Sequence, residues 1–167
     1  PETLASMERA QPAAARMLPS APAFDAVAFA CTSASSVIGS DTVAKAIRSV
    51  CPDARATDPL DAIIAAGRSL GARRLGFVTP YLPDVTALMR RRLEEAGFEI
   101  AAFGSFEEGD DRVVARITEA SIQQAVAAVA GASPCDAIVV SCTNLRCLDV
   151  IPEAERLTLV VVHLKTG

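Results

Sequence analysis

Residues 24–33 (FDAVAFACTS) and residues 135–144 (CDAIVVSCTN) follow the same pattern. In each stretch, Asp-Ala leads into an apolar run that is closed by Cys-Thr and a small polar residue. A continuous apolar run between polar residues is typical of a buried strand in a parallel sheet. Cys31 and Cys142 then follow the carboxyl ends of their strands, where open α/β sheets form ligand-binding crevices. The repeat therefore predicts a pocket that two thiols face from opposite sides.

The composition is that of a globular chain with a small-molecule partner. The 167 residues suffice for one ordinary core, or for two small lobes that share an interface. No run of eighteen apolar residues occurs, so we expect no membrane span. The net charge of −4 and an aromatic content of 4% argue against binding of nucleic acid, which favours basic and aromatic surfaces.

The five cysteines indicate free thiols rather than a disulfide framework. Their number is odd, and the chain opens without the basic segment and apolar stretch of a signal peptide. This combination favours a reduced, cytoplasmic protein. A zinc site requires four nitrogen or sulfur ligands, and the single histidine, His163, lies near the far end of the chain. We therefore expect no metal.

Strand-like and helix-like segments alternate along the chain, which predicts an α/β fold with parallel sheets flanked by helices. We expect strands at residues 24–30, 54–57, 74–78, 98–103, 136–140 and 159–162. We expect helices at residues 3–18, 40–50, 60–70, 85–96, 121–130 and 145–156. Asp58 and Pro59 are a start signal for one of these helices, and Gly97 is a stop signal for another.

The repeat predicts two similar lobes related by a pseudo-two-fold axis, with the active site between them. Residues 1–58 form the first lobe with Cys31, and residues 59–162 form the second lobe with Cys142. Residues 163–167 are a tail that we expect to return to the first lobe. A strand and a loop precede the second motif by some distance, whereas the residues before Cys31 predict a helix. We therefore expect the first lobe to lack its opening strand.

Four stretches together resemble the aspartate/glutamate racemase superfamily, and within it the branch of maleate cis-trans isomerases and arylmalonate decarboxylases. They are residues 30–35 (ACTSAS), 73–81 (RRLGFVTPY), 110–117 (DDRVVARI) and 141–146 (SCTNLR). With residues 148–152 (LDVIP), the resemblance covers most of the chain up to about residue 157. The first motif, followed by Val37-Ile38-Gly39, is similar to a sub-branch of ectoine-utilisation proteins. The last is more similar to maleate isomerases.

The resemblance implies a cofactor-free enzyme with its pocket between two lobes and one cysteine from each. Cys31 and Cys142 match the catalytic pair of the family. The positions that match carboxylate-binding residues, together with the adjacent amide, are Thr32, Ser33, Tyr81, Thr143 and Asn144. The chain departs from the family pattern in three places. It starts after the opening strand and its Ser-Asn loop, it has Asp111 where maleate isomerases commonly have an amide, and it ends in a compressed tail at residues 160–167.

A thiol at a helix N-terminus ionises more easily, because exposed N–H groups and the helix dipole stabilise the thiolate. We expect this for Cys142, and less so for Cys31, whose following helix is expected after Gly39. Other interpretations remain open. Either cysteine can be a small buried residue at a strand end, the hydroxyl and amide residues can be helix caps, and Tyr81 can lie on a surface loop. The paired motifs favour a functional role.

These observations favour a cofactor-independent isomerase or racemase of a small carboxylate. In a racemase, one thiolate removes the α-proton and the opposite thiol delivers one to the other face. In maleate-type isomerisation, one cysteine, which the resemblance implies is Cys31, adds to the alkene as a nucleophile and leaves after rotation about the C–C bond. An arylmalonate-type decarboxylase, which needs only Cys142, and a non-catalytic carboxylate-binding protein are the alternatives. The sequence leaves the substrate and the oligomeric state open, with a homodimer as one option.

Overall fold

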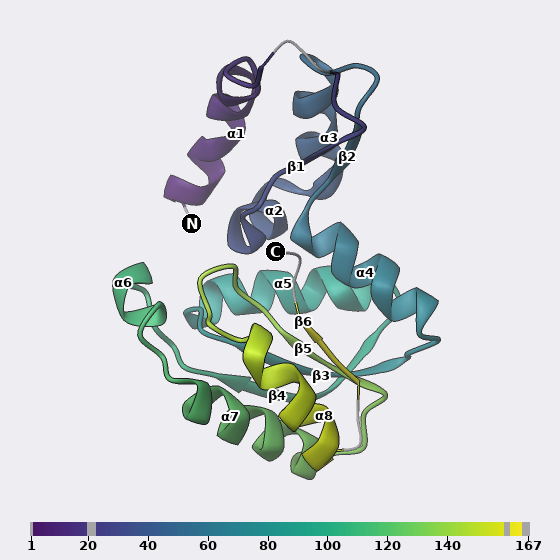
Figure 1. Ribbon diagram of the computed structural model, residues 1–167, viewed down its shortest axis with the longest axis vertical. Helices are drawn as coiled ribbons and strands as arrows, with labels where there is room; N and C mark the ends of the chain where they lie inside the picture. The colour runs from purple at the N-terminus through teal and green to yellow at the C-terminus, as the bar shows by residue number, and fades with distance from the viewer. Residues whose placement is uncertain (1, 20–22, 159–160, 165–167) are drawn as a thin grey trace.

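The computed structural model describes residues 2–19, 23–158 and 161–164, which form a smaller and a larger lobe (Figure 1). The smaller lobe holds a two-stranded parallel sheet of β1 (Ala26–Ala28) and β2 (Arg55–Thr57). The larger lobe holds a four-stranded parallel sheet in the order β4 (Glu99–Ser105), β3 (Arg74–Thr79), β5 (Ala137–Val140), β6 (Val161–Leu164). The expected α/β fold with parallel sheets flanked by helices is confirmed.

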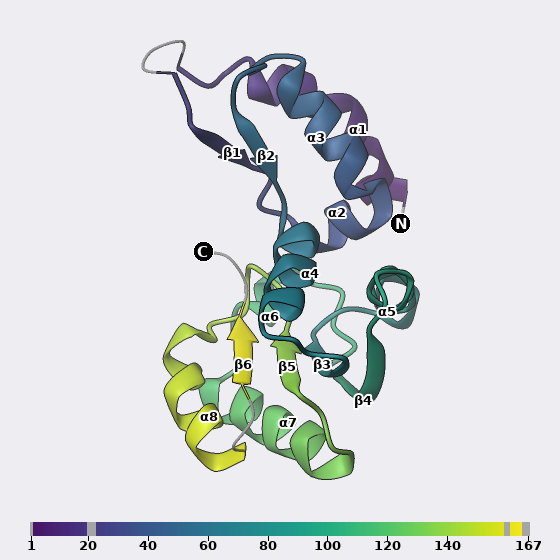
Figure 2. The ribbon, with the colours of Figure 1, turned by 90° about the vertical axis from the view of Figure 1, so that its right-hand side faces the viewer.

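Helices cover both sheets. In chain order they are α1 (Glu2–Ala15), α2 (Thr32–Ile38), α3 (Ser40–Arg48), α4 (Pro59–Ser69), α5 (Pro83–Glu95), α6 (Asp111–Val114), α7 (Glu119–Ala132), the 3-10 helix η1 (Leu148–Val150) and α8 (Ile151–Thr158). In the smaller lobe α1 packs on α2 and α3. In the larger lobe α4 and α5 lie on one face of the sheet, and α7 and α8 lie on the other (Figures 1 and 2). None of the helices within the described residues is long and apolar enough to cross a membrane.

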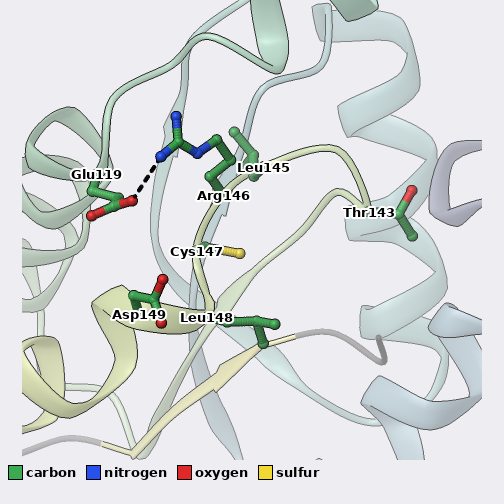
Figure 3. A pocket seen from close by; sticks show the side chains of 7 residues that line it. All are labelled: Glu119, Thr143, Leu145, Arg146, Cys147, Leu148 and Asp149. Carbon is green, nitrogen blue, oxygen red and sulfur yellow. Dashed lines mark hydrogen bonds and ion pairs between the residues drawn. The ribbon is translucent and has the colours of Figure 1, made fainter.

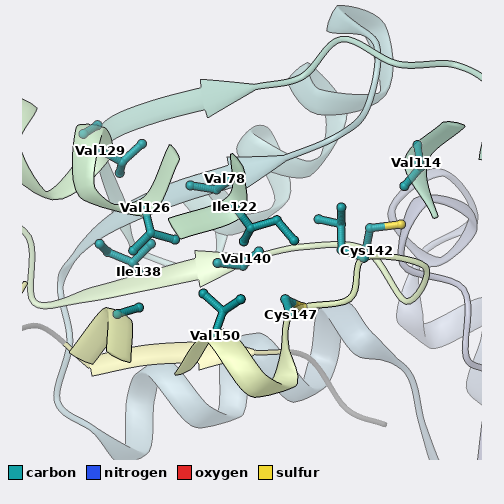
Figure 4. Packing of buried hydrophobic residues seen from close by; sticks show 13 residues of the cluster. Val78, Val114, Ile122, Val126, Val129, Ile138, Val140, Cys142, Cys147 and Val150 are labelled. Atoms are coloured by element: carbon teal, nitrogen blue, oxygen red, sulfur yellow. The ribbon is translucent and has the colours of Figure 1, made fainter. Parts of the chain in front are cut away.

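The apolar runs of β3 and β5 are continuous because both faces of the sheet are buried. Leu75 and Phe77 pack toward α4 and α5, together with Met89 and Leu93 of α5. On the opposite face a second cluster joins strand residues to α7, η1 and α8 (Figure 4). This alternation of side chains between two helical layers is what a central parallel strand requires.

Gly76 lets α7 approach β3 closely. A Cβ atom at this position would lie 2.7 Å from Cγ1 of Val129 and 3.0 Å from Cγ1 of Ile138. Atoms at these distances overlap, so any larger side chain at Gly76 pushes α7 away from the sheet. The glycine in the RRLGFVTPY stretch is therefore a packing requirement of this layer.

The strands of the larger sheet direct their carboxyl ends toward the smaller lobe (Figure 2). At that edge the chain continues the ladder for one residue past β5, where the backbone N–H of Ser141 donates to the carbonyl of Val78 at 2.9 Å. Helix α2 lies between the lobes, since it contacts α1 and α3 of the smaller lobe and α4 and α5 of the larger one. The loops that follow β3 and β5 therefore meet the start of α2.

Several elements differ from the sequence-based expectations. The helix α2 was not expected, and the helix expected at 145–156 begins only at η1 and α8. Pro152 lies in the first turn of α8, where a proline is tolerated because its missing N–H has no helical partner. Strand β6 includes His163 and Leu164, which fall in the predicted tail. Residues 159–160 of the predicted last strand and 165–167 of the tail lie outside the described residues.

Asp58 marks the passage from one lobe to the other. Its buried carboxylate accepts hydrogen bonds from the backbone N–H groups of Leu60 and Asp61, at 2.9 and 3.2 Å, and so caps α4. Leu60 and Ile63 of α4 then pack into the core of the larger lobe. On this basis we propose the division between residues 1–58 and 59–162 as the boundary of the two lobes.

Candidate active site

Cys31 is the N-cap residue of α2, in an extended conformation with φ −125° and ψ 106°. The expectation that its helix begins only after Gly39 is wrong. The first helical hydrogen bond runs from the Ser35 N–H to the Cys31 carbonyl at 2.9 Å, so the N–H groups of Thr32 and Ser33 have no helical partner. The Cys31 sulfur lies 3.6 Å from the Ser33 hydroxyl oxygen. One thiol and two N–H groups therefore stand together at the start of α2.

The sequence of α2 is a poor helix former, and its surroundings explain why it folds. Ser, Thr and β-branched residues have weak helix propensity, which tertiary packing can override. The hydroxyls of Ser35 and Ser36 are buried and donate to the Thr32 carbonyl at 3.0 and 2.9 Å. The helix ends at Gly39, whose φ of +90° suits glycine. Burial between the lobes, with the polar groups satisfied inside the helix, stabilises this segment.

Cys142 follows β5 but does not start a helix. The chain continues in turns, and the next regular element is η1 at Leu148, so the expected helix N-terminus at Cys142 is wrong. Cys142 is 4% exposed and has φ +155°, a backbone conformation that L residues rarely adopt. Its sulfur accepts a hydrogen bond from the backbone N–H of Asn144 at 3.3 Å. Unusual backbone conformations of this kind are concentrated at functional sites.

Tyr81 follows β3, and its backbone is held from three sides. Its N–H donates to the Thr79 hydroxyl at 3.2 Å, and its carbonyl accepts from the hydroxyls of Thr86 and Ser105 at 3.2 and 2.7 Å. The Tyr81 side chain is half-buried and contacts the hydrophobic clusters on both faces of the larger sheet. Tyr81 is therefore a fixed part of the sheet edge and not a residue of a surface loop.

The Tyr81 hydroxyl lies close to residues of both cysteine motifs. Burial raises the pKa of Tyr81 far above its ordinary value, and the adjacent Cys142 thiol raises that pKa further through charge and a hydrogen bond. The Thr32 hydroxyl lowers the pKa of Tyr81, and the charge of Cys31 raises this pKa by a smaller amount. The phenol consequently stays protonated at neutral pH and serves as a hydrogen-bond donor between the two cysteine motifs.

Thr32 contributes a buried hydroxyl that has no ordinary hydrogen-bond partner among the described residues. The residue is 1% exposed, and its oxygen has no hydrogen bond of ordinary distance and angle within the described residues. The oxygen nevertheless lies near enough to the Tyr81 hydroxyl to lower the pKa of that group. A buried hydroxyl without a proper partner costs free energy, and such groups in folded proteins call for an explanation. A bound carboxylate between Thr32 and Tyr81 would supply one.

Thr143 and Asn144 have different surroundings from the other predicted site residues. Thr143 is exposed and lines a cavity of about 260 Å³ beside the Cys142 loop (Figure 3). The other residues around that cavity are Glu119, Leu145, Arg146, Cys147, Leu148 and Asp149. The Asn144 Nδ2 group donates to the carbonyl of Asp111 at 2.7 Å. The structure therefore gathers Cys31, Thr32, Ser33, Tyr81 and Cys142, and places Thr143 and the Asn144 amide beside this group.

Helix α6 is a part of the site that sequence reasoning missed. Val114 at its end is 2% exposed and belongs to the same hydrophobic cluster as Cys142 and Leu145 (Figure 4). The signal was present in Asp110 and Arg112, because an aspartate at the N-cap accepts from a backbone N–H two or three residues on. Here the Asp110 carboxylate accepts from the Arg112 N–H at 2.8 Å.

None of the five cysteines forms a disulfide, and no group of three His, Cys, Asp or Glu side chains suited to a metal ion occurs within the residues that the structure describes. The residues gathered at the site supply two thiols, a neutral phenol, two hydroxyls and the N–H groups at the start of α2. These groups can donate hydrogen bonds to an anion and exchange protons or electron pairs with its carbon atoms.

The family model for arylmalonate decarboxylase matches residues 5–165 of the chain. The chain belongs to the arylmalonate decarboxylase family. The arylmalonate decarboxylase of Bordetella bronchiseptica is 32% identical over 96 residues, which span 57% of this chain and 40% of that protein. The chain thus aligns with less than half the length of this curated relative.

Solved structures of the arylmalonate decarboxylase family branch share the fold. The maleate isomerase of Pseudomonas putida is 25% identical with a TM-score of 0.84, and the match covers 98% of this chain and 68% of that one. A maleate cis-trans isomerase of Nocardia farcinica with a covalently bound succinylcysteine intermediate is 24% identical with a TM-score of 0.86, covering 98% of this chain and 69% of that one. The predicted membership of the racemase-like superfamily, in its isomerase and decarboxylase branch, is confirmed.

Proposed function

We propose that this member of the arylmalonate decarboxylase family is a cofactor-independent isomerase or racemase of a small carboxylate, in which Cys31 and Cys142 act from the two lobes. The observation that carries the proposal is the position of the Tyr81 hydroxyl, which hydrogen-bonds to Cys142 and also lies near Thr32 and Cys31. A substrate bound at this phenol touches both cysteine motifs. The related enzymes include both maleate isomerases and decarboxylases.

Carboxylate binding in this proposal rests on groups that can donate a hydrogen bond to an anion. The Tyr81 phenol is neutral because burial keeps its pKa high, so it donates to a carboxylate oxygen. The Thr32 hydroxyl is buried without an ordinary hydrogen bond and supplies a second donor. The N–H groups of Thr32 and Ser33, which have no partner within α2, are further candidate donors.

The isomerisation follows from the same geometry. The Cys31 thiolate adds to one alkene carbon, which forms a C–S bond and moves the π electrons onto the adjacent carboxylate as an enediolate. Rotation about the resulting C–C single bond is then free, and return of the electron pair expels the thiolate and forms the trans alkene. The Tyr81 and Thr32 hydroxyls stabilise the negative charge on the carboxylate oxygens while it is greatest. In this proposal, Cys142 has the role of proton donor and acceptor for the adjacent carbon.

Decarboxylation is the second candidate, and the family match favours it. In that reaction the C–C bond to one carboxylate breaks, carbon dioxide leaves, and the electron pair stays on the remaining carboxylate as an enediolate. Cys142 then delivers a proton to the carbon. This sequence requires no thiol at position 31. The presence of Cys31 in addition to Cys142 is therefore what favours isomerisation or racemisation over decarboxylation.

The test is to incubate the purified protein with maleate, an arylmalonate and single enantiomers of aspartate and glutamate, and to identify products by NMR and chiral chromatography. We expect conversion of maleate or of one enantiomer in the parent protein and no conversion in Cys31→Ser. Release of carbon dioxide from the arylmalonate with equal rates in the parent and in Cys31→Ser would instead establish the decarboxylase. Binding of these carboxylates without any turnover would favour the carboxylate-binding protein.

A further inference from the structure

Asn144 makes two hydrogen bonds that join Cys142 to helix α6. Its backbone N–H donates to the Cys142 sulfur at 3.3 Å, and its Nδ2 group donates to the Asp111 carbonyl at 2.7 Å. The side-chain bond of Asn144 to α6 therefore also fixes its backbone N–H, which donates to the Cys142 sulfur. Because one residue makes both contacts, movement of its side chain is transmitted directly to the N–H group beside the sulfur.

Helix α6 is a firm support for this contact. Asp111 is its first residue, and the preceding Asp110 caps it by accepting from the Arg112 N–H and forming an ion pair with the Arg112 guanidinium at 2.7 Å. At the other end of the helix, Val114 is buried in the cluster that contains Cys142 (Figure 4). The Asp111 carbonyl is therefore held in place from both ends of α6.

The backbone of Cys142 needs such a support. Its φ of +155° is rarely adopted by L residues, and such a conformation persists only where the surrounding structure holds it. On the strand side the loop is fixed by the Ser141 N–H bond to Val78 at 2.9 Å. On the far side, Asn144 is the first residue after Cys142 with a side-chain hydrogen bond to another element of the described structure. The two contacts bracket the strained residue.

We propose that Asn144 is a positioning residue for the Cys142 thiolate: its side-chain bond to Asp111 holds the loop so that its own N–H remains directed at the sulfur. A hydrogen bond from an N–H group to a thiolate favours the charged form and fixes the direction of the sulfur lone pairs. This assignment replaces the substrate-binding role expected for Asn144 from the sequence. It rests on the proposed function only in taking Cys142 as a reacting group.

The titratable groups that face Cys142 are known from the surrounding elements. Tyr81 approaches it from the loop after β3, and Cys31, at the start of α2, is near enough to the same phenol to act on it through its charge. Asp111 contributes its backbone carbonyl to the contact, and its carboxylate takes no part in it. A change in Asn144 leaves Tyr81 and Cys31 in place. An altered alkylation rate of Cys142 can then be assigned to the lost support.

The experiment measures the rate at which iodoacetamide alkylates Cys142 as a function of pH, with the modified peptide identified by mass spectrometry. The variants are Asn144→Ala, which removes the donor, and the isosteric Asn144→Asp, which places a carboxylate oxygen against the Asp111 carbonyl. We expect both to slow alkylation at neutral pH by about tenfold, the loss of one charge-assisted hydrogen bond. The isosteric variant decides the question if the alanine variant does not fold.

The matched control is Arg146→Gln. The Arg146 guanidinium pairs with Glu119 at 3.2 Å and so also ties the Cys142 loop to the chain segment beyond α6, without touching Cys142. We expect its alkylation profile to equal that of the parent. An equal slowing in Arg146→Gln would show that any loosening of the loop suffices and would overturn the assignment.

Turnover, where a substrate is established, separates positioning from binding. We expect the Asn144 variants to lower kcat with little change in KM, because the bond acts on the thiolate and not on the bound substrate. A raised KM together with an unchanged alkylation profile would overturn the proposal and restore Asn144 as a substrate-binding residue. The alkylation assay needs no substrate. If no turnover is found, the proposed function is contradicted, and the alkylation profile still decides the role of Asn144.

Discussion

The Tyr81 hydroxyl and the Cys142 thiol meet at the carboxyl edge of the larger sheet, one after β3 and the other after the neighbouring β5. Because parallel neighbours end at the same edge, residues far apart in sequence are brought into hydrogen-bond contact. The contact has an electrostatic consequence. Burial and the charge that Cys142 can carry both oppose ionisation of the phenol, so the two acids do not ionise together.

The first prediction concerns the titration of Tyr81. The chain has one tyrosine and no tryptophan, so the ultraviolet absorbance of tyrosinate reports on Tyr81 alone. We expect the native protein to show no tyrosinate as the pH passes the ordinary pKa of 10.0, whereas the denatured protein ionises there. Tyrosinate formation in the native protein at the ordinary pKa, with circular dichroism unchanged, would contradict the buried position of the phenol.

The same pKa shift predicts the pH dependence of stability. The folded-state pKa of Tyr81 lies above the unfolded value of 10.0, so the folded state holds the proton more tightly. The stabilisation from this group is fully present below pH 10 and is lost as the pH rises from there toward the folded-state pKa. We expect the Tm of the parent to fall more steeply above this pH than the Tm of Tyr81→Phe. Parallel curves would mean that the phenol ionises equally in both states.

The cysteine variants test which thiols react. We expect Cys31→Ser and Cys142→Ser each to abolish isomerisation, and the double variant to be no worse than either, because members of one catalytic unit act non-additively. Cys135→Ser is the control. Burial raises the pKa of the Cys135 thiol, and that residue lies at the opposite end of β5 from Cys142. Substantial loss of turnover in Cys135→Ser, with the fold retained, would contradict the assignment of the two reacting thiols.

The strands were predictable because burial on both faces leaves a direct mark on the sequence. The run that became β5 is apolar at every position, and β3 is buried at every position after Arg74, a pattern that a central parallel strand or a buried helix explains. The placement of Cys142 after a strand followed from the run of β5. The first run, residues 24–30, was expected to be a buried strand, and this was wrong, because β1 spans only Ala26–Ala28 and Ala26 and Ala28 are exposed. The contact of both motifs with Tyr81 depends on the pairing of β3 with β5 and on the packing of α2, and neither leaves a local pattern.

The helices near the two thiols were the less predictable part. The α2 sequence TSASSVI has weak helix propensity, and it folds as a helix because its serine hydroxyls bond to the Thr32 carbonyl within a buried setting. After Cys142 a helix was expected where the chain forms turns. The segment from Leu145 has helix-compatible residues, but its chain turns first so that Leu145, Cys147 and Val150 can all be buried against the sheet. Tertiary packing decided both cases.

Glycine at position 76 supplies a prediction about the core. A Cβ atom there would lie 2.7 Å from Val129, so we expect Gly76→Ala to lower the free energy of unfolding by about 1–3 kcal/mol through overpacking. Gly131→Ala in α7 is the matched control, since a Cβ atom there meets nothing within 4 Å. An alanine at an open helical position stabilises by about 0.5–1 kcal/mol. Urea denaturation measures both values, and equal effects of the two substitutions would contradict the close packing of α7 on β3.

The last prediction uses solvent deuterium to separate the reactions. A thiol that protonates carbon exchanges with water, so racemisation or decarboxylation in D2O places deuterium on the α-carbon of the product. Addition of Cys31 to maleate, rotation and elimination break no C–H bond obligatorily, so the fumarate can form without label. We expect unlabelled fumarate by mass spectrometry if the enzyme acts as an isomerase through Cys31 alone. Fumarate that carries one deuterium would show that Cys142 protonates the adduct before elimination. An amino acid that racemises in D2O without acquiring deuterium would rule out the two thiols as the acid and the base.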